Sequence, residues 1–294
     1  MKKVLVTGAR GFIGSQLCFE LSQRGYAVLK MGRSKGGDNA ISWLDNDDEI
    51  LVKIEGVHGI IHLAGESVAG GLFTSKRKEK ILSSRVETGK RLVSLVSRLN
   101  QPPEFFFQAS AVGFYGNSVK NSVTEQAPQG QGFLADVCAD WESSTLNLEE
   151  LGICRAVGRI GIVLGHGGFL GKVASPMKLF AGGHLGDGSN YIPWIHLEDC
   201  IRIIIHLMEN QVSGIFNLTA NSPVPSREFF QELGSALGRP SWLHVPKFAL
   251  NLAGEFGKEV LLASQNVLPA AIGETGYSFK FKNLAAALQD IYSS

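Results

Sequence analysis

The stretch Lys3-Val-Leu-Val-Thr-Gly-Ala-Arg-Gly-Phe-Ile-Gly14 decides the fold of this chain. Val4, Leu5 and Val6 form a short apolar run of the kind found in buried strands. Three glycines follow at three-residue spacing, and residues 15–24 then show the apolar periodicity of a helix. The stretch therefore predicts a strand, a tight glycine turn and a helix in direct succession.

The glycine spacing is typical of a dinucleotide-binding turn. Gly8 permits the tight turn, Gly11 lets a pyrophosphate approach the backbone, and Gly14 lets the helix pack close to the strand. The free N–H groups and the positive dipole end of the helix then hold the phosphates. We therefore predict that these three glycines bind a cofactor together with Phe12 and Ile13; the alternative is a purely structural glycine turn.

The end of the second predicted strand indicates which dinucleotide is bound. NAD-binding proteins place a carboxylate on the ribose hydroxyl about 20 residues after the turn. This chain has Met31-Gly-Arg-Ser34 at that place, with no carboxylate. Arg33 with Ser34, and Arg10 inside the turn, instead suit a 2′-phosphate, which arginine binds through paired hydrogen bonds. We predict NADP(H) rather than NAD(H), the alternative being that both arginines are solvated surface residues.

Strands and helices alternate through the first part of the chain. Strands are expected at 27–31, 40–44, 57–63, 105–109 and 153–164, and helices at 48–54, 76–99 and 135–151. Because parallel strands need crossover helices, this order predicts an α/β fold with a Rossmann-type, doubly wound parallel sheet. We expect an NADP-binding domain over 1–165, to which 192–220 returns, and a smaller C-terminal substrate lobe over 166–191 and 221–294.

The amino-acid composition limits the classes of partner that we expect for this protein. Among the 294 residues, 44% are hydrophobic and 19% are charged, and the net charge is +1, which indicates neither a nucleic-acid nor a membrane partner. The four cysteines are scattered without metal-ligand spacing, so we expect reduced thiols, no metal and a cytoplasmic location. We expect a small-molecule substrate, and a homodimer through the long helices stays open.

The chain resembles the atypical, epimerase-like members of the extended short-chain dehydrogenase/reductases, related to the NAD-dependent epimerase/dehydratases and including their C-terminal domain. The segments that carry the resemblance are spread over the whole chain: Thr7–Gly14, Leu63-Ala-Gly-Glu66, Ser84-Arg85, Ser110–Gly116, Asp140-Trp-Glu142, Arg159–Gly165, Trp194–Asp199, Asn217–Ala220, Gly238-Arg-Pro240 and Val267-Leu-Pro269. The resemblance implies a Rossmann-type domain with bound NADP and an epimerase-like substrate lobe.

One departure from the family pattern concerns proton transfer. Typical members carry Tyr-x-x-x-Lys on the helix after the fifth strand, and a serine or threonine assists. Counting back from Glu142 places Leu134 and Cys138 at the tyrosine and lysine positions, and counting from Gly116 places Ala111 at the serine position. The resemblance therefore implies that all three proton-handling groups are missing. Ser110 lies one residue earlier, but strand alternation is expected to point it to the opposite side of the sheet.

Other groups are candidates for that chemistry. Glu66 directly follows the turn after the fourth predicted strand and can act as a base, although such loop carboxylates often cap a segment or pair with an arginine. Tyr115 and Cys138 are the other catalytic candidates, each with a packing role as the alternative. Further cofactor contacts are expected from Leu63, Ala64, Gly65, Arg85 and Arg159.

Two functions remain open at this point. The first is an NADP(H)-dependent epimerase-like oxidoreductase with an unusual acid/base set, acting on an unidentified nucleotide sugar or small carbonyl compound. The second is a non-catalytic NADP(H)-binding redox sensor or regulatory protein. We favour the enzyme, because a sensor would hardly need a shaped second wall to its cleft.

Overall fold

The computed structural model describes residues 1–34, 40–180, 182–243, 245, 246, 252 and 254–293, with the backbone alone at 118–120. Among these residues, seven parallel strands form one sheet in the order β11-β7-β5-β4-β1-β2-β3. The strands are β1 (Lys3–Thr7), β2 (Ala27–Gly32), β3 (Ala40–Ser42), β4 (Gly59–His62), β5 (Phe105–Ala111), β7 (Cys154–Ile160) and β11 (Gly214–Leu218). The predicted Rossmann-type α/β fold is confirmed.

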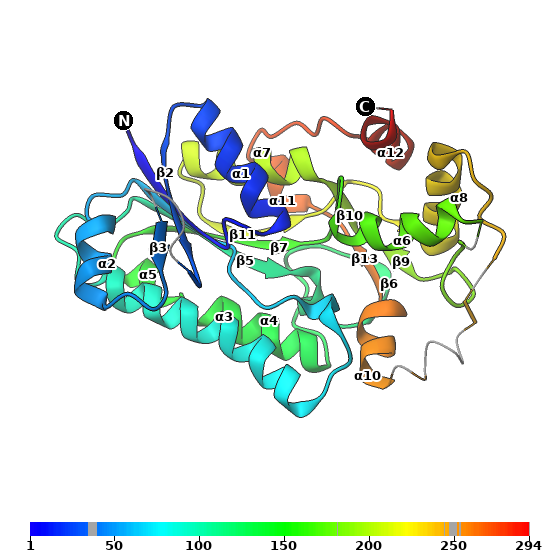
Figure 1. Cartoon of the computed structure of the whole chain (residues 1–294), viewed down its shortest axis with the longest axis horizontal. Coiled ribbons are helices and arrows are strands. Elements are labelled where there is room, and N and C mark those ends of the chain that lie inside the picture. The colour runs from blue at the N-terminus through cyan, green and yellow to red at the C-terminus, as the bar shows by residue number, and fades with distance from the viewer. Residues whose placement is uncertain (35–39, 181, 244, 247–251, 253, 294) are drawn as a thin grey trace.

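Helices cover both faces of this sheet (Figure 1). One layer contains α1 (Phe12–Gln23) and α7 (Leu197–Glu209), and the other contains α2 (Asp47–Ile54), α3 (Ser75–Val96), α4 (Phe133–Ser143) and α5 (Asn147–Glu150). The central strands are fully buried because they are apolar on both sides, as the run Phe105-Phe-Phe107 illustrates. Two short 3-10 helices, η1 (Val68–Gly70) and η2 (Val112–Tyr115), follow β4 and β5 at their carboxyl ends.

Two expected elements are each divided in two. The helix expected over 135–151 ends at Ser143 and resumes as α5, and the Thr145 hydroxyl between them accepts a hydrogen bond from Arg155 Nε at 2.9 Å. The strand expected over 153–164 breaks at Gly161, where a Cβ atom would lie 2.3 Å from the Pro193 oxygen. The chain therefore leaves the sheet at Gly161 and continues as β8 (Ile162–Leu164).

The smaller lobe has its own apolar core. Strand β8 pairs with β10 (Trp194–His196), and β9 (Tyr191–Ile192) pairs with β12 (Val224–Pro225). Helices α6 (Gly168–Lys178), α8 (Ser226–Leu237) and α12 (Leu284–Tyr292) pack around the buried Trp194 and Phe229. These elements lie together at one end of the molecule (Figure 1).

The C-terminal part also contacts the first domain. Strand β13 (Ser264–Val267) pairs with β6 (Ser118–Val123), preceded by α10 (Gly254–Phe256) and a π-helical turn (Gly257–Leu261). After α11 (Ala270–Glu274), Phe279 and the helix's own Ile272 pack into the core of the large sheet. None of the helices in the described ranges is long and apolar enough to cross a membrane.

Candidate functional site

The glycine turn joins β1 to α1 in a space that admits no side chain. Gly8 has φ +69°, and a Cβ atom there would lie 2.9 Å from the main chain of Leu63. A Cβ atom on Gly14 would lie 2.2 Å from the Gly8 oxygen. The turn therefore holds its shape through backbone contacts that only glycine permits.

The N-terminus of α1 is open for an acceptor. Gly11 is its N-cap in an extended conformation, and no side chain caps the helix. The N–H groups of Phe12, Ile13 and Gly14 lie in the first turn, where an α-helix provides no carbonyl partner. Such a helix end attracts an anion, so this backbone fits the pyrophosphate of a dinucleotide.

Next to the turn, two arginines follow the pattern expected for a 2′-phosphate. Arg10 Nη1 donates a hydrogen bond of 2.7 Å to the Ser34 hydroxyl, so the turn and the end of β2 are in contact. Arg33 and Ser34 are exposed, as is Arg10. No acidic residue lies between the end of β2 and Ser34. The arrangement is positive and solvent-accessible.

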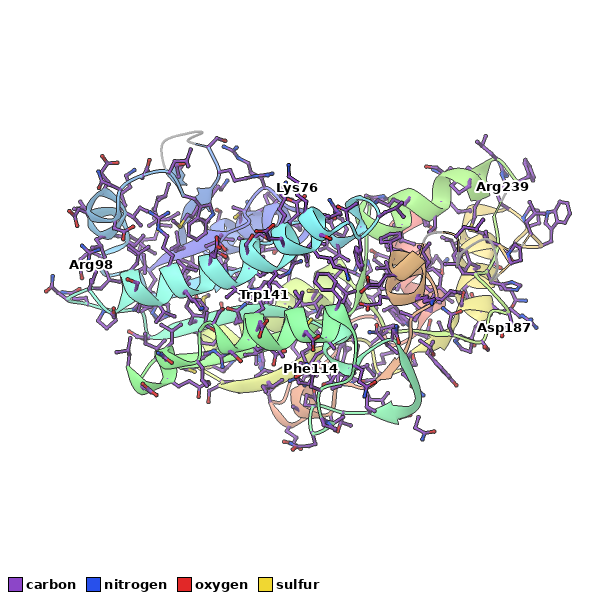
Figure 2. The ribbon with its side chains drawn as sticks, turned by 90° about the horizontal axis from the view of Figure 1, so that it is seen from below. Lys76, Arg98, Phe114, Trp141, Asp187 and Arg239 are labelled. Carbon is purple, nitrogen blue, oxygen red and sulfur yellow. The ribbon has the colours of Figure 1, made fainter. Side chains whose placement is uncertain are left out.

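The turn after β4, residues 63–65, lies against Arg85 of α3. A Cβ atom on Gly65 would lie 3.0 Å from Arg85 Cζ. Arg85 Nη1 donates to the main-chain oxygens of Glu66 and Ile81 at 2.9 and 3.0 Å, and the guanidinium lies 4.9 Å above the Trp141 ring. Figure 2 shows Trp141 between α3 and α4, which run side by side. Burial lowers the pKa of Arg85, although part of the side chain remains accessible.

His62, at the end of β4, is a site residue whose contacts could not be predicted from the sequence. Its Nδ1 lies 2.7 Å from the Thr7 hydroxyl, and its Nε2 lies 3.3 Å from the Thr88 hydroxyl, which itself donates to Ser84. Burial, and then the charge of Arg85, lower the pKa of His62 to about 3. The imidazole is therefore neutral and joins β1, β4 and α3.

At the end of β5, the three positions that the resemblance identifies lie close to one another. A Cβ atom on Gly113 would lie 3.5 Å from Leu134 and 3.7 Å from the Cys138 sulfur, and Ala111 bonds Cys138 through its backbone. Burial, and then the charge of Glu142, raise the pKa of the Cys138 thiol to about 11. The thiol thus remains protonated near neutral pH.

Ser110 faces α4, where it donates a hydrogen bond of 2.6 Å to Glu142 Oε1 and also contacts Cys138. The hydroxyl thus lies on the side of the sheet where Cys138 lies. Its proton is donated to the Glu142 carboxylate.

Tyr115 and Arg159 belong to a buried polar network next to the carboxyl end of β5. Arg159 donates to both carboxylate oxygens of Glu142 at 2.9 Å and to the Tyr115 hydroxyl at 3.0 Å. The Tyr115 hydroxyl in turn donates to Asn217 Oδ1 at 2.8 Å. All hydrogen bonds of that hydroxyl are therefore internal, and the roles predicted for Tyr115 and Arg159 stay predictions.

The Glu66 carboxylate lies between two cations of α3. Its oxygens are 3.9 Å from Arg77 Nη1 and 3.4 Å from Lys80 Nζ, and about a fifth of the side chain is exposed. The pairing with an arginine that the sequence left open as an alternative is present.

A carboxylate from the C-terminal part reaches α4. Glu259 accepts hydrogen bonds from the N–H groups of Phe133 and Leu134 at 3.0 and 2.9 Å, at the first turn of the helix. Phe133 also packs edge-on against Phe73, which in turn contacts Phe256. The sequence gives no signal for this contact, because Glu259 lies 126 residues from Phe133.

A cavity of about 610 Å³ lies elsewhere, between α1, α7 and α12. None of the predicted site residues lines it. Two of its arginines pair with carboxylates, Arg24 with Glu209 and Arg202 with Glu198. The candidate site expected from the sequence is at the carboxyl ends of the parallel strands, where ligands bind in open α/β sheets.

Comparison with protein families identifies the family of the chain. The model of the NAD dependent epimerase/dehydratase family matches residues 4–219, which is most of the chain. This chain belongs to that family. A domain of unknown function, DUF1731, matches residues 245–291.

Full-length relatives have the same organisation. The epimerase family protein SDR39U1 homolog, chloroplastic, of Arabidopsis thaliana is 36% identical over 98% of this chain and 86% of its own length. The human epimerase family protein SDR39U1 is 33% identical over 98% of this chain and 99% of its own length. A crystal structure of the human protein (isoform 2) with NADPH has a TM-score of 0.91 at 32% identity, covering 99% of both chains. The UDP-N-acetylglucosamine 4-epimerase of Bacillus cereus, at 16% identity and a TM-score of 0.79, shares the fold.

Proposed function

We propose that this protein is an NADP(H)-dependent, epimerase-like oxidoreductase whose acid/base set differs from Tyr-x-x-x-Lys. The observation that carries the proposal is the glycine turn with Arg10 bonded to Ser34 and without an acidic residue at the end of β2. The human relative whose structure contains NADPH supports the choice of cofactor.

Different residues of this chain would bind different parts of the cofactor. The N–H groups of Phe12, Ile13 and Gly14 would bind the pyrophosphate, and Arg10 with Arg33 would bind the 2′-phosphate. The turn at residues 63–65, after β4, would line the nicotinamide half of the cofactor. Bound NADP(H) supplies the hydride chemistry, and the protein supplies orientation and proton transfer.

For proton transfer, Glu66 is the candidate that the structure favours. The Tyr115 hydroxyl already donates to Asn217, and the Cys138 thiol is buried with a raised pKa. Glu66 is partly exposed, and its carboxylate directly follows the turn after β4, beside Arg77 and Lys80. We therefore propose Glu66 as the base.

The experiment combines cofactor binding with turnover. We expect NADPH to bind more tightly than NADH, and a panel of sugar nucleotides and small carbonyl compounds, followed by NADPH absorbance, to yield a substrate. Glu66→Gln should then lose turnover but keep NADPH binding, whereas Glu79→Gln, on the exposed side of α3, should keep both. Tight NADPH binding without turnover of any compound would favour a redox sensor, and absence of binding would refute both functions.

A further inference from the structure

Arg85 is a cation beside the turn after β4, and its guanidinium has no carboxylate partner within the described residues. Its guanidinium bonds main-chain oxygens and stacks on Trp141, and within the described part of the chain it forms no ion pair. Buried charges in proteins are normally paired, because removal from water is costly. The positive charge of Arg85 is therefore not neutralised by an ion pair with any of the described residues.

The neighbouring groups do not cancel this charge. His62 is neutral, the Cys138 thiol is protonated, and the charge of Glu142 is balanced by Arg159. The nearest carboxylate that acts on Arg85 is Glu66, which has two cations of its own beside it. The turn after β4 consequently lies in positively charged surroundings, with Arg85, Arg77 and Lys80 around the single carboxylate of Glu66.

The topology assigns Arg85 to one half of the cofactor. The pyrophosphate belongs at the N-terminus of α1, and the arginines at the end of β2 belong to the adenosine phosphate. The dinucleotide crosses the switch point of the sheet, so its nicotinamide half is expected over the carboxyl ends of β4 and β5. Arg85 lies there, between the turn after β4 and Cys138.

We propose that Arg85 makes the site select reduced NADPH over oxidised NADP⁺, an inference that rests on the NADP(H) site proposed above. The oxidised nicotinamide ring carries a positive charge and the reduced ring is neutral. A guanidinium in a weakly polarisable wall repels the oxidised ring, by about tenfold or more in affinity. The protein then stays loaded with NADPH in the presence of NADP⁺, which suits a reductive reaction.

Calorimetric titration of the full chain with NADPH and with NADP⁺ tests the proposal. We expect the wild type to bind NADPH at least ~10-fold more tightly. Arg85→Gln should bring the ratio of the two dissociation constants close to one, whereas Arg85→Lys should keep it. Lys90→Gln removes a positive charge from the exposed side of the same helix and should leave the ratio unchanged.

Two results would overturn the proposal. One is equal affinity of the wild type for both forms, which needs no variant and is decisive if Arg85→Gln does not fold. The other is a full preference for NADPH in folded Arg85→Gln, which would trace the preference to the shape of the ring. Failure of both cofactor forms to bind would instead refute the NADP(H) site itself.

Discussion

The two ends of the cleft are built in different ways. At the β1–β2 end, the turn and Arg10 present N–H groups and positive charge to solvent, and the residues that do so are close in sequence. At the β4–β5 end, polar side chains mostly bind one another, as Tyr115 binds Asn217 across 102 residues. The first end is made from one local motif, and the second is a packed network next to which Arg85 forms no ion pair with the residues that the structure describes.

The largest effect is expected where the network is broken. Glu142→Ala leaves the buried Arg159 guanidinium without its carboxylate, which should lower the free energy of unfolding by about 3–5 kcal/mol. Glu209→Ala removes one partner of the exposed pair with Arg24 and should cost about 0–1 kcal/mol. Urea denaturation of both variants measures the difference. Equal losses would show that the network does not stabilise this end of the cleft.

How much the sequence could predict follows the same division. The glycine turn and the arginines expected for NADP are read from residues within about 30 positions of one another, and the alternation of strands and helices is read from local patterns, so periodicity and spacing suffice. The partners of Glu142 and Glu259 come from segments far apart in sequence and depend on how the helices pack. The direction of Ser110 was also wrong, because the sequence shows the alternation of a strand but not which face meets α4.

The second prediction concerns the local motif. Gly14→Ala places a Cβ atom 2.2 Å from the Gly8 oxygen, and a main-chain oxygen cannot move without distorting the turn. We expect NADPH affinity to fall at least ~10-fold and stability to fall by about 1–3 kcal/mol. Gly273→Ala, where the Cβ meets open space in α11, should change neither. Unchanged binding by folded Gly14→Ala would exclude the turn as the pyrophosphate site.

The third prediction concerns the contribution of His62 to the pH dependence of the free energy of unfolding. Its pKa is about 3 in the folded chain against 6.5 for an ordinary histidine, so protons bind preferentially to the unfolded chain below pH 6.5. The stability that His62 contributes is complete above pH 6.5 and decreases as the pH falls toward 3. Between pH 7 and 5, this amounts to about 2 kcal/mol.

Thermal unfolding at both pH values checks this linkage. His62→Asn should flatten the pH dependence, and the exposed His166→Asn should retain it. The same slope in wild type and His62→Asn would mean that His62 is not held neutral by its surroundings.

The smallest effect is expected at the exposed arginines and decides which cofactor the β1–β2 end selects. Arg10→Ala should weaken NADPH binding about fivefold, since a charge-assisted hydrogen bond to a solvent-exposed phosphate contributes about 1 kcal/mol. Arg33→Ala should act similarly, and NADH binding should change little, because NADH lacks the 2′-phosphate. Raising the salt concentration should reduce the NADPH preference of the wild type and leave that of the Arg10→Ala, Arg33→Ala double variant low.

If the variants lose affinity for NADH in parallel with NADPH, the two arginines stabilise the turn and do not bind the 2′-phosphate. The β1–β2 end would then bind the pyrophosphate alone, and the selectivity of the cleft would reside at its β4–β5 end.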